Sequence, residues 1–197
     1  MKKRNQMLFL SPDELLSLLA AARQHSNRAW SMICTSYWHA LRASEVCGLT
    51  FADIDKENDA LTIRRLKDSL ETKQAFRKQR GVPLLDEEKA LRSWLAERPA
   101  DDQSTFVFTS QKGGEMDRTA FWRMFQDVAA AAGIPQEKRN PRVLKHSLAS
   151  HMVAAGENLA HVQQALGHRS YKSTLCYVGV SDSQADTAVQ RAASNLF

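Results

Sequence analysis

Basic side chains occur in pairs that could bind an anion at two places in the chain. Within residues 64–67, Arg65 and Lys67 are two positions apart, so on a strand their side chains share one face. Arg142 and Lys145 are three positions apart, which brings them together on one flank of a helix. Two neighbouring cations favour a bound anion such as a phosphate. The alternative is that these long side chains extend into water without a ligand.

Positive charge is concentrated in residues 61–82. The chain of 197 residues has 27 Lys and Arg against 22 Asp and Glu, and seven of these cations but only two of these anions fall in that segment. A basic segment on an otherwise neutral chain is typical of a surface that contacts the phosphates of nucleic acid. A charged hairpin that is simply exposed to water is the alternative. The DNA-contacting residues predicted there are Arg64, Arg65, Lys73, Arg77, Lys78 and Arg80.

Metal and cofactor chemistry finds no support in the sequence. Cys34, Cys47 and Cys176 form no C-x-x-C pair, and the six histidines show no H-E-x-x-H spacing. We expect reduced thiols packed in a core, with no metal and no cofactor. The chain has no apolar run long enough to cross a bilayer or to act as a signal peptide, so we predict a cytoplasmic protein with no membrane partner.

The elements that position the basic pairs are mostly helical. Ser11, Pro12 and Glu14 form a capping box with proline at the first helical position, which predicts a helix over 12–23. Further helices are predicted over 28–40, 86–97, 117–132, 141–155, 158–166 and 181–193, with short helical pieces after Arg42 and around Tyr177. Strands are predicted over 60–65, 77–84 and 105–109. The fold class is therefore α+β, mainly α-helical with a small antiparallel sheet.

Three segments together carry a family resemblance. Residues 39–49 read HALRASEVCGL, residues 144–151 read LKHSLASH, and residues 166–177 begin with LGH and end with a tyrosine nine positions after His168. They resemble, in this order, the arginine box, the L-R-H-[ST]-x-A-T-H helix and the L-G-H…Y ending of the tyrosine recombinases of the phage-integrase family. The resemblance spans residues 10–180 and is nearest to the short fimbrial-switch invertases. It implies the catalytic-domain fold of these DNA breaking-rejoining enzymes.

The resemblance implies a role for the tyrosine and for the first arginine. Tyr177 matches the nucleophile, whose phenolic oxygen attacks a scissile phosphate to give a 3′-phosphotyrosyl link and a free 5′-hydroxyl, without ATP. Arg42 matches the first of two arginines that bind the nonbridging oxygens, a task that suits a planar, bidentate guanidinium. Glu45 would orient Arg42. A surface ion pair between Arg42 and Glu45 is the structural alternative.

Other roles follow from the same resemblance. Lys67 matches the hairpin lysine, the general acid that protonates the departing 5′-oxygen, with Lys73 as the fallback because the turn is longer here than in the invertases. His168 matches a donor to the phosphate in the transition state, although a capping or core histidine is the alternative. Arg169 beside it is a further predicted DNA contact. Tyr171 lacks the nine-residue step from the histidine, so we expect it to pack in the protein.

The sequence departs from the family pattern at two catalytic positions. Where the family reads H-x-x-R, this chain has Arg142 and Lys145. Both residues keep positive charge beside the phosphate, but lysine cannot form a two-pronged contact and arginine cannot accept a proton. One step along a helix turns neighbouring His146 by about 100° from the direction of Lys145, so the spacing gives little ground for it to substitute.

These observations predict one catalytic domain over residues 1–197 that recombines double-stranded DNA at specific sites. Residues 1–10 would form a basic, flexible N-terminus, and residues 181–197 a helix that packs on a neighbouring subunit of a homotetramer on DNA. A bacterial or phage origin goes with the family. The alternative function is a DNA-binding regulator or accessory factor that keeps the fold but has weakened or lost catalysis through the changes at Arg142 and Lys145.

Overall fold

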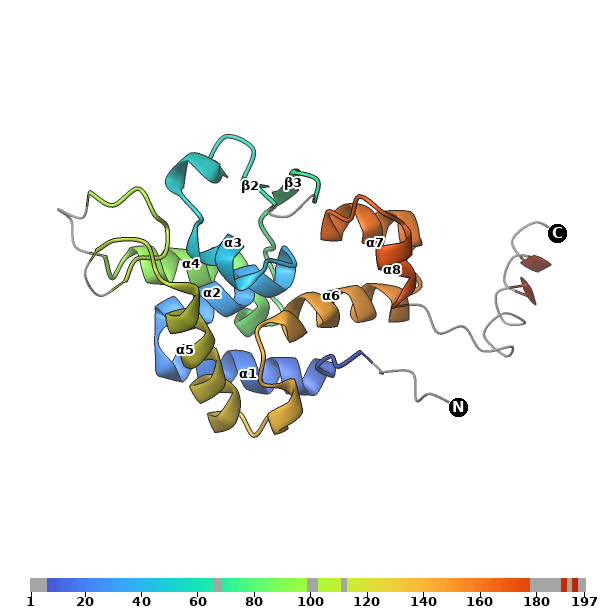
Figure 1. Ribbon diagram of the computed structural model, residues 1–197, viewed down its shortest axis with the longest axis horizontal. Helices are drawn as coiled ribbons and strands as arrows, with labels where there is room; N and C mark the ends of the chain where they lie inside the picture. The colour runs from blue at the N-terminus through green and yellow to red at the C-terminus, as the bar shows by residue number, and fades with distance from the viewer. Residues whose placement is uncertain are drawn as a thin grey trace.

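The chain folds into a helical body with one small sheet at its edge (Figure 1). The computed structural model describes residues 7–65, 69–98, 103–110, 113–177, 189–190 and 193–194. The expected fold class is confirmed. The helices within these ranges are α1 (Pro12–His25), α2 (Asn27–Trp38), α3 (Ala43–Cys47), α4 (Glu87–Leu95), α5 (Arg118–Ala131), α6 (Arg142–Ala154), α7 (Leu159–Leu166) and α8 (Lys172–Leu175), with 3-10 turns η1 (Phe51–Asp53), η2 (Pro83–Leu85) and η3 (Gln136–Lys138).

Helix α1 begins at the predicted capping box. The Ser11 hydroxyl accepts from the Glu14 amide, and the Glu14 carboxylate accepts from the Ser11 amide at 2.7 Å, so two otherwise unpaired donors are satisfied. The helix ends at His25, and the next residue, Ser26, caps α2 by accepting from the Ala29 amide at 3.0 Å. Consecutive caps thus separate two helices that pack against each other.

The core is built around α2. Its residues from Ala29 to Tyr37 are all buried, and the helix packs against α1, α4 and α6. The largest fully buried side chains include Trp30 from α2 and Phe121 and Phe125 from α5. Cys34 and Cys47 are buried as expected, but Cys176 is exposed, so the prediction of a packed thiol was wrong there.

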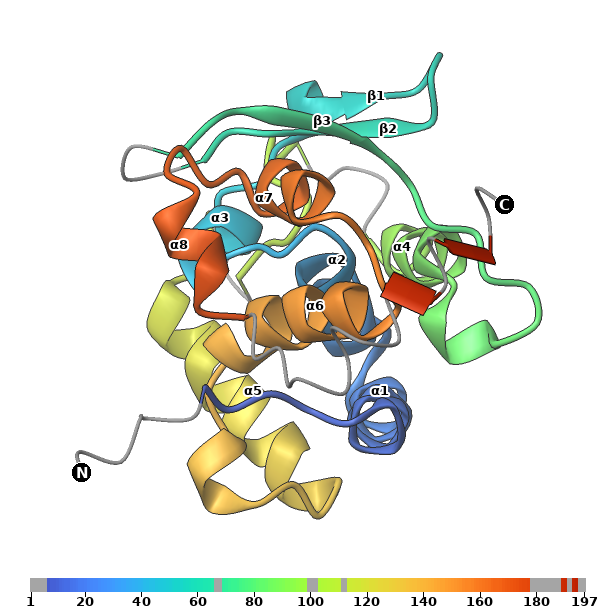
Figure 2. The same cartoon turned by 90° about the vertical axis from the view of Figure 1, so that its right-hand side faces the viewer.

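The sheet has three antiparallel strands in the order β1 (Ile54–Asp55), β2 (Ala60–Ile63) and β3 (Thr72–Ala75) (Figure 2). The strand predicted over 77–84 was wrong, because β3 lies earlier in the chain. Gln74 explains the difference, since its amide donates to the Ala165 carbonyl at 3.0 Å and its oxygen bonds His39 at 3.1 Å. Contacts with distant elements therefore decide which segment pairs with β2. Residues 105–109 form only isolated bridges.

Helices α6, α7 and α8 follow one another along the chain, and α7 packs between β3 and α6 (Figure 2). Helix α6 begins at Arg142 and packs through Leu144 and Leu148. Helix α7 ends at Gly167, whose φ of 64° favours glycine. A Cβ at this position would lie 2.9 Å from the Leu70 carbonyl oxygen, so the close approach of the hairpin also requires glycine.

The chain end was predicted less well than α6. Helix α8 stops at Leu175, so Tyr177 lies in the turn that follows the predicted helical piece. Tyr171 is 45% exposed, so the expectation that it packs in the protein was wrong. The predicted C-terminal helix over 181–193 and most of the tail lie outside the described residues, as do residues 1–6 of the predicted flexible N-terminus.

Candidate active site

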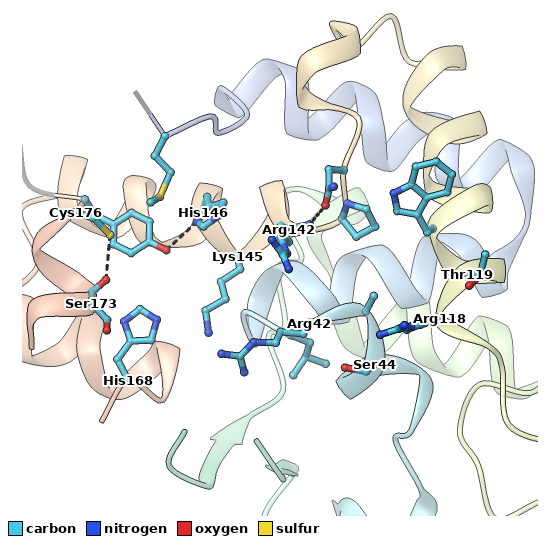
Figure 3. Close-up of a pocket in the computed structure, with 17 residues that line it drawn as sticks. Arg42, Ser44, Arg118, Thr119, Arg142, Lys145, His146, His168, Ser173 and Cys176 are labelled. Atoms are coloured by element: carbon cyan, nitrogen blue, oxygen red, sulfur yellow. Dashed lines mark hydrogen bonds between the residues drawn. The ribbon is translucent and has the colours of Figure 1, made fainter. Parts of the chain in front are cut away.

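An open pocket of about 890 Å³ lies between α3, α5, α6 and α8. Five of the six predicted catalytic residues line it, namely Arg42, Arg142, Lys145, His168 and Tyr177. In Figure 3, the side chains of Arg42, Lys145 and His168 extend into a common space from three separate elements. The sixth residue, Lys67, lies outside the described residues. Segments more than a hundred residues apart in sequence therefore meet at one site.

Arg42 is held at the start of α3 by Glu45. The carboxylate of Glu45 accepts from the Arg42 amide at 2.8 Å and from its guanidinium at 2.6 Å. The Glu45 side chain is 1% exposed, whereas that of Arg42 is 33% exposed and also donates to the Ser69 hydroxyl. Glu45 thus holds both the amide and the guanidinium of Arg42, and Arg42 lines the pocket.

The side chain of Arg65 is buried next to Glu45, so its prediction as a DNA contact was wrong. Its side chain is 0% exposed and donates to the carbonyl oxygens of His39, Ala40 and Ala165 at 2.8–2.9 Å. Its guanidinium is also 3.5 Å from the Glu45 carboxylate. The residue therefore joins the end of α2, the hairpin and α7, and supports the carboxylate that holds Arg42.

Among the predicted catalytic residues that the structure describes, only Lys145 is buried. Its ammonium donates to the Leu166 carbonyl at 2.9 Å. Burial, followed by the nearby charges of Arg65 and Arg42, lowers the pKa of Lys145 to about 7. Lys145 can therefore lose its proton and its charge near neutral pH, whereas an arginine at this position would stay cationic.

His168 follows α7 and is fixed by Thr174. Its Nδ1 lies 3.0 Å from the Thr174 hydroxyl, which is fully buried, and the imidazole ring is stacked on that of Tyr177 at 6.4 Å. Burial and the cations Lys145 and Arg42 lower the pKa of His168 to about 4. The ring is therefore neutral at pH 7, and a threonine hydroxyl that donates to Nδ1 would leave the Nε2 proton for a ligand.

The hydroxyl of Tyr177 contacts a residue that sequence reasoning had set aside. His146 Nδ1 lies 2.8 Å from Tyr177 Oη, and both residues line the pocket. Burial raises the pKa of Tyr177. The position of His146 directly after Lys145 is the one feature of the sequence that could have indicated it. Its contact with Tyr177, however, depends on how the turn after α8 returns to α6.

Arg142 and α5 complete the pocket wall. Arg142 is exposed at the first position of α6, and its amide donates to the Asn140 side chain at 3.0 Å. Arg118, Thr119 and Trp122 from the first turns of α5 also line the pocket, and the sequence reasoning missed them. They carry no motif, so only the packing of α5 against α3 brings them to the site.

The remaining predicted DNA contacts lie on or near the hairpin. Arg64 is 2.9 Å from Asp53 and remains 67% exposed. Lys73, the fallback for Lys67, pairs with Asp55 on β1 and does not line the pocket. Among the predicted DNA contacts that the structure describes, Arg65 alone has a buried side chain. The others are exposed, namely Arg64, Lys73, Arg77, Lys78, Arg80 and Arg169.

A single family accounts for the motifs and for their convergence on one pocket. Residues 8–184 match the model of one protein family, which is described as "Phage integrase family". The chain belongs to the phage integrase family. This integrase-family chain is 34% identical over 181 residues to the type 1 fimbriae regulatory protein FimB of Escherichia coli strain K12, which covers 89% of this chain and 84% of FimB. The resemblance expected from the sequence is confirmed.

Solved structures show the same fold. The crystal structure of XerA recombinase superposes on this integrase-family chain with a TM-score of 0.76 at 25% identity, over 96% of this chain and 66% of that one. The integrase of transposon Tn1549, in complex with a circular intermediate DNA, gives a TM-score of 0.80 at 20% identity over 97% of this chain and 68% of that one. This chain therefore spans about two thirds of each solved chain.

Where the structure describes the chain, it contains no helix with the length and apolar character needed to cross a membrane.

Proposed function

We propose that this chain is a site-specific recombinase that cuts and rejoins double-stranded DNA through a 3′-phosphotyrosyl intermediate. One observation carries the proposal: Tyr177 lines the same pocket as the cations Arg42 and Lys145 and the imidazole of His168. A phenol beside several fixed donors suits attack on a phosphodiester, because those donors stabilise the charge that develops on the phosphate oxygens.

Each side chain then has a stated task. Tyr177 attacks phosphorus, and the bond to the 5′-oxygen breaks, so the phosphodiester energy is kept in the protein–DNA link. Arg42 binds a nonbridging oxygen, with its geometry set by Glu45. His168 donates to the same phosphate. Lys67 would protonate the departing 5′-oxygen, and this assignment remains a proposal from the family resemblance.

The test is to trap the intermediate without knowing the target sequence. A library of randomised duplexes, each nicked on one strand, lets the 5′-hydroxyl fragment leave so that rejoining cannot occur. We expect a covalent protein–DNA adduct, and mass spectrometry of the digested product should place a nucleotide phosphate on Tyr177. The matched control is the same library without nicks, which should yield less adduct. An adduct located on any other residue would contradict the proposal.

The changes at Arg142 and Lys145 bear on the rate. Both residues line the pocket and keep positive charge there. A lost transition-state contact of this kind costs about tenfold to a thousandfold in rate. We therefore propose a recombinase of reduced activity rather than a protein that only binds DNA, because the nucleophile, the first arginine and the histidine remain together at one site.

The rate of adduct formation is expected to fall at alkaline pH because of Lys145. The pKa of this lysine is lowered to about 7, so the ammonium that binds phosphate is present below pH 7 and lost above it. The second-order rate constant, which reports the free enzyme, should fall by about tenfold for each pH unit above 7. Lys145→Arg should remove this dependence, because the guanidinium stays charged.

Lys172→Arg is the control for that pH profile, because Lys172 is exposed on α8. It should keep the alkaline fall of the unmodified protein. A Lys145→Arg protein that retains the same fall would assign the titration to another group.

The partner we propose is double-stranded DNA bound across the pocket and the exposed cations of the hairpin. The Tn1549 integrase and a lambda integrase dimer were solved on DNA, which supports this partner. We also propose that the chain assembles as a tetramer on DNA through residues 181–197 and that it acts in the cytoplasm, where its DNA substrate lies.

A further inference from the structure

The hydroxyl of Tyr177 is within hydrogen-bonding distance of the His146 imidazole. His146 lies on α6, one position after Lys145, and its Nδ1 is 2.8 Å from Tyr177 Oη. The two rings are 5.8 Å apart and inclined at 44°. Figure 3 shows His146 on the same wall of the pocket as Lys145. This distance is within the range over which a general base takes a proton directly.

Attack by the phenol requires a proton acceptor. Burial raises the pKa of Tyr177, so its phenolate is scarce at neutral pH and the proton must leave as the new bond forms. The family pattern places a histidine three positions before Lys145, but this chain has Arg142 there. A guanidinium has no acceptor, so Arg142 cannot take the proton.

The imidazole of His146 is in the neutral form, which can accept a proton. Burial, followed by the charges of Lys145 and Arg142, lowers its pKa, so the imidazole is neutral at pH 7. A neutral ring with its proton on Nε2 presents a lone pair at Nδ1. The charged and titratable groups that line a pocket together with His146 come from every element around it. They are Arg42 at the start of α3, Arg118 from α5, Arg142 and Lys145 from α6, Glu137 and Lys138 from η3, and His168, Cys176 and Tyr177 from the segment after α7.

We propose that His146 is the general base of strand cleavage, an assignment that rests on the function proposed above. Its Nδ1 takes the proton of Tyr177 while Oη bonds to phosphorus and the bond between phosphorus and the 5′-oxygen breaks. The 5′-oxygen leaves with a proton from the general acid, so one proton enters and one leaves the reacting centre. On rejoining, His146 returns its proton to the phenolic oxygen. The role that the family pattern gives to position 142 thus moves to position 146.

The experiment compares three variants in single-turnover adduct formation on nicked DNA. His146→Gln keeps a side chain that can bond the phenol but removes the titrating base, so we expect a rate about a hundredfold lower. The fall in rate at acidic pH below the ordinary histidine range, which protonation of His146 causes in the unmodified protein, should also be absent. His146→Ala should be slow and should recover with added imidazole. His161→Gln, at an exposed site on α7, should behave as the unmodified protein.

The outcomes separate the two proposals. An unmodified protein that forms no adduct on Tyr177 would overturn the proposed function and this inference with it. A normal adduct together with a His146→Gln rate within twofold of the unmodified protein would overturn the inference alone. A slow His146→Ala protein that binds DNA normally and does not respond to imidazole would also overturn it, because the ring would then only position Tyr177.

Discussion

Tyr177→Phe is expected to abolish the covalent adduct while leaving the fold and DNA affinity unchanged. The substitution removes one oxygen, and the ring that packs against the core is retained. Without the hydroxyl, neither the bond to phosphorus nor the contact with His146 can form. Adduct formation on nicked DNA should become undetectable in a denaturing gel. Binding measured by gel shift should stay within about twofold, because the phosphate-binding cations are intact.

Tyr171→Phe is the matched control for this prediction. Tyr171 is six positions before the proposed nucleophile and is 45% exposed, and it does not line the pocket. The Tyr171→Phe protein should form adduct at the rate of the unmodified protein. An adduct in Tyr177→Phe at that rate would assign the nucleophile to another residue and remove the basis of the proposed function.

The sequence predicted the parts of the site that depend on short-range spacing. Glu45 follows Arg42 by three positions at the start of a helix, so the capping geometry that joins them is local. The step from His168 to Tyr177 is also local, because α8 and its turns fold within those ten residues. Motifs of this kind fix their own local geometry, whereas packing between distant segments brings Arg42, His168 and Tyr177 to one pocket.

The parts that were missed depend on contacts between distant segments. Whether a basic residue at the end of a strand faces DNA or the core cannot be read from its charge, and Arg65 faces the core because three carbonyl oxygens converge there. The direction of His146 depends on the turn that carries Tyr177 back to α6. Pairing of β3 with β2 depends on Gln74 and its bond to α7. None of these contacts leaves a periodic pattern in the sequence.

Because the side chain of Arg65 is buried, its loss should lower the stability of the fold. A cation on a DNA-binding surface contributes little to folding, whereas removal of one partner from a buried charge pair costs about 3–5 kcal/mol. Arg65→Met leaves the carbonyls of His39, Ala40 and Ala165 without this donor and removes the cation 3.5 Å from Glu45. We expect the free energy of unfolding, measured by urea denaturation, to fall by about that amount.

The neighbouring arginine is the matched control, because Arg64 is 67% exposed and pairs only with Asp53 among the ion pairs that the described residues form. Arg64→Met should change the free energy of unfolding by about 0–1 kcal/mol. It should instead weaken DNA binding and reduce the slope of log affinity against log salt by about one, as expected for one lost phosphate contact. Arg65→Met, measured at a temperature where it is folded, should keep the unmodified slope. The reverse pattern, with Arg65→Met stable and its salt slope reduced, would return Arg65 to the DNA-contacting surface and leave Arg42 without the support proposed for it.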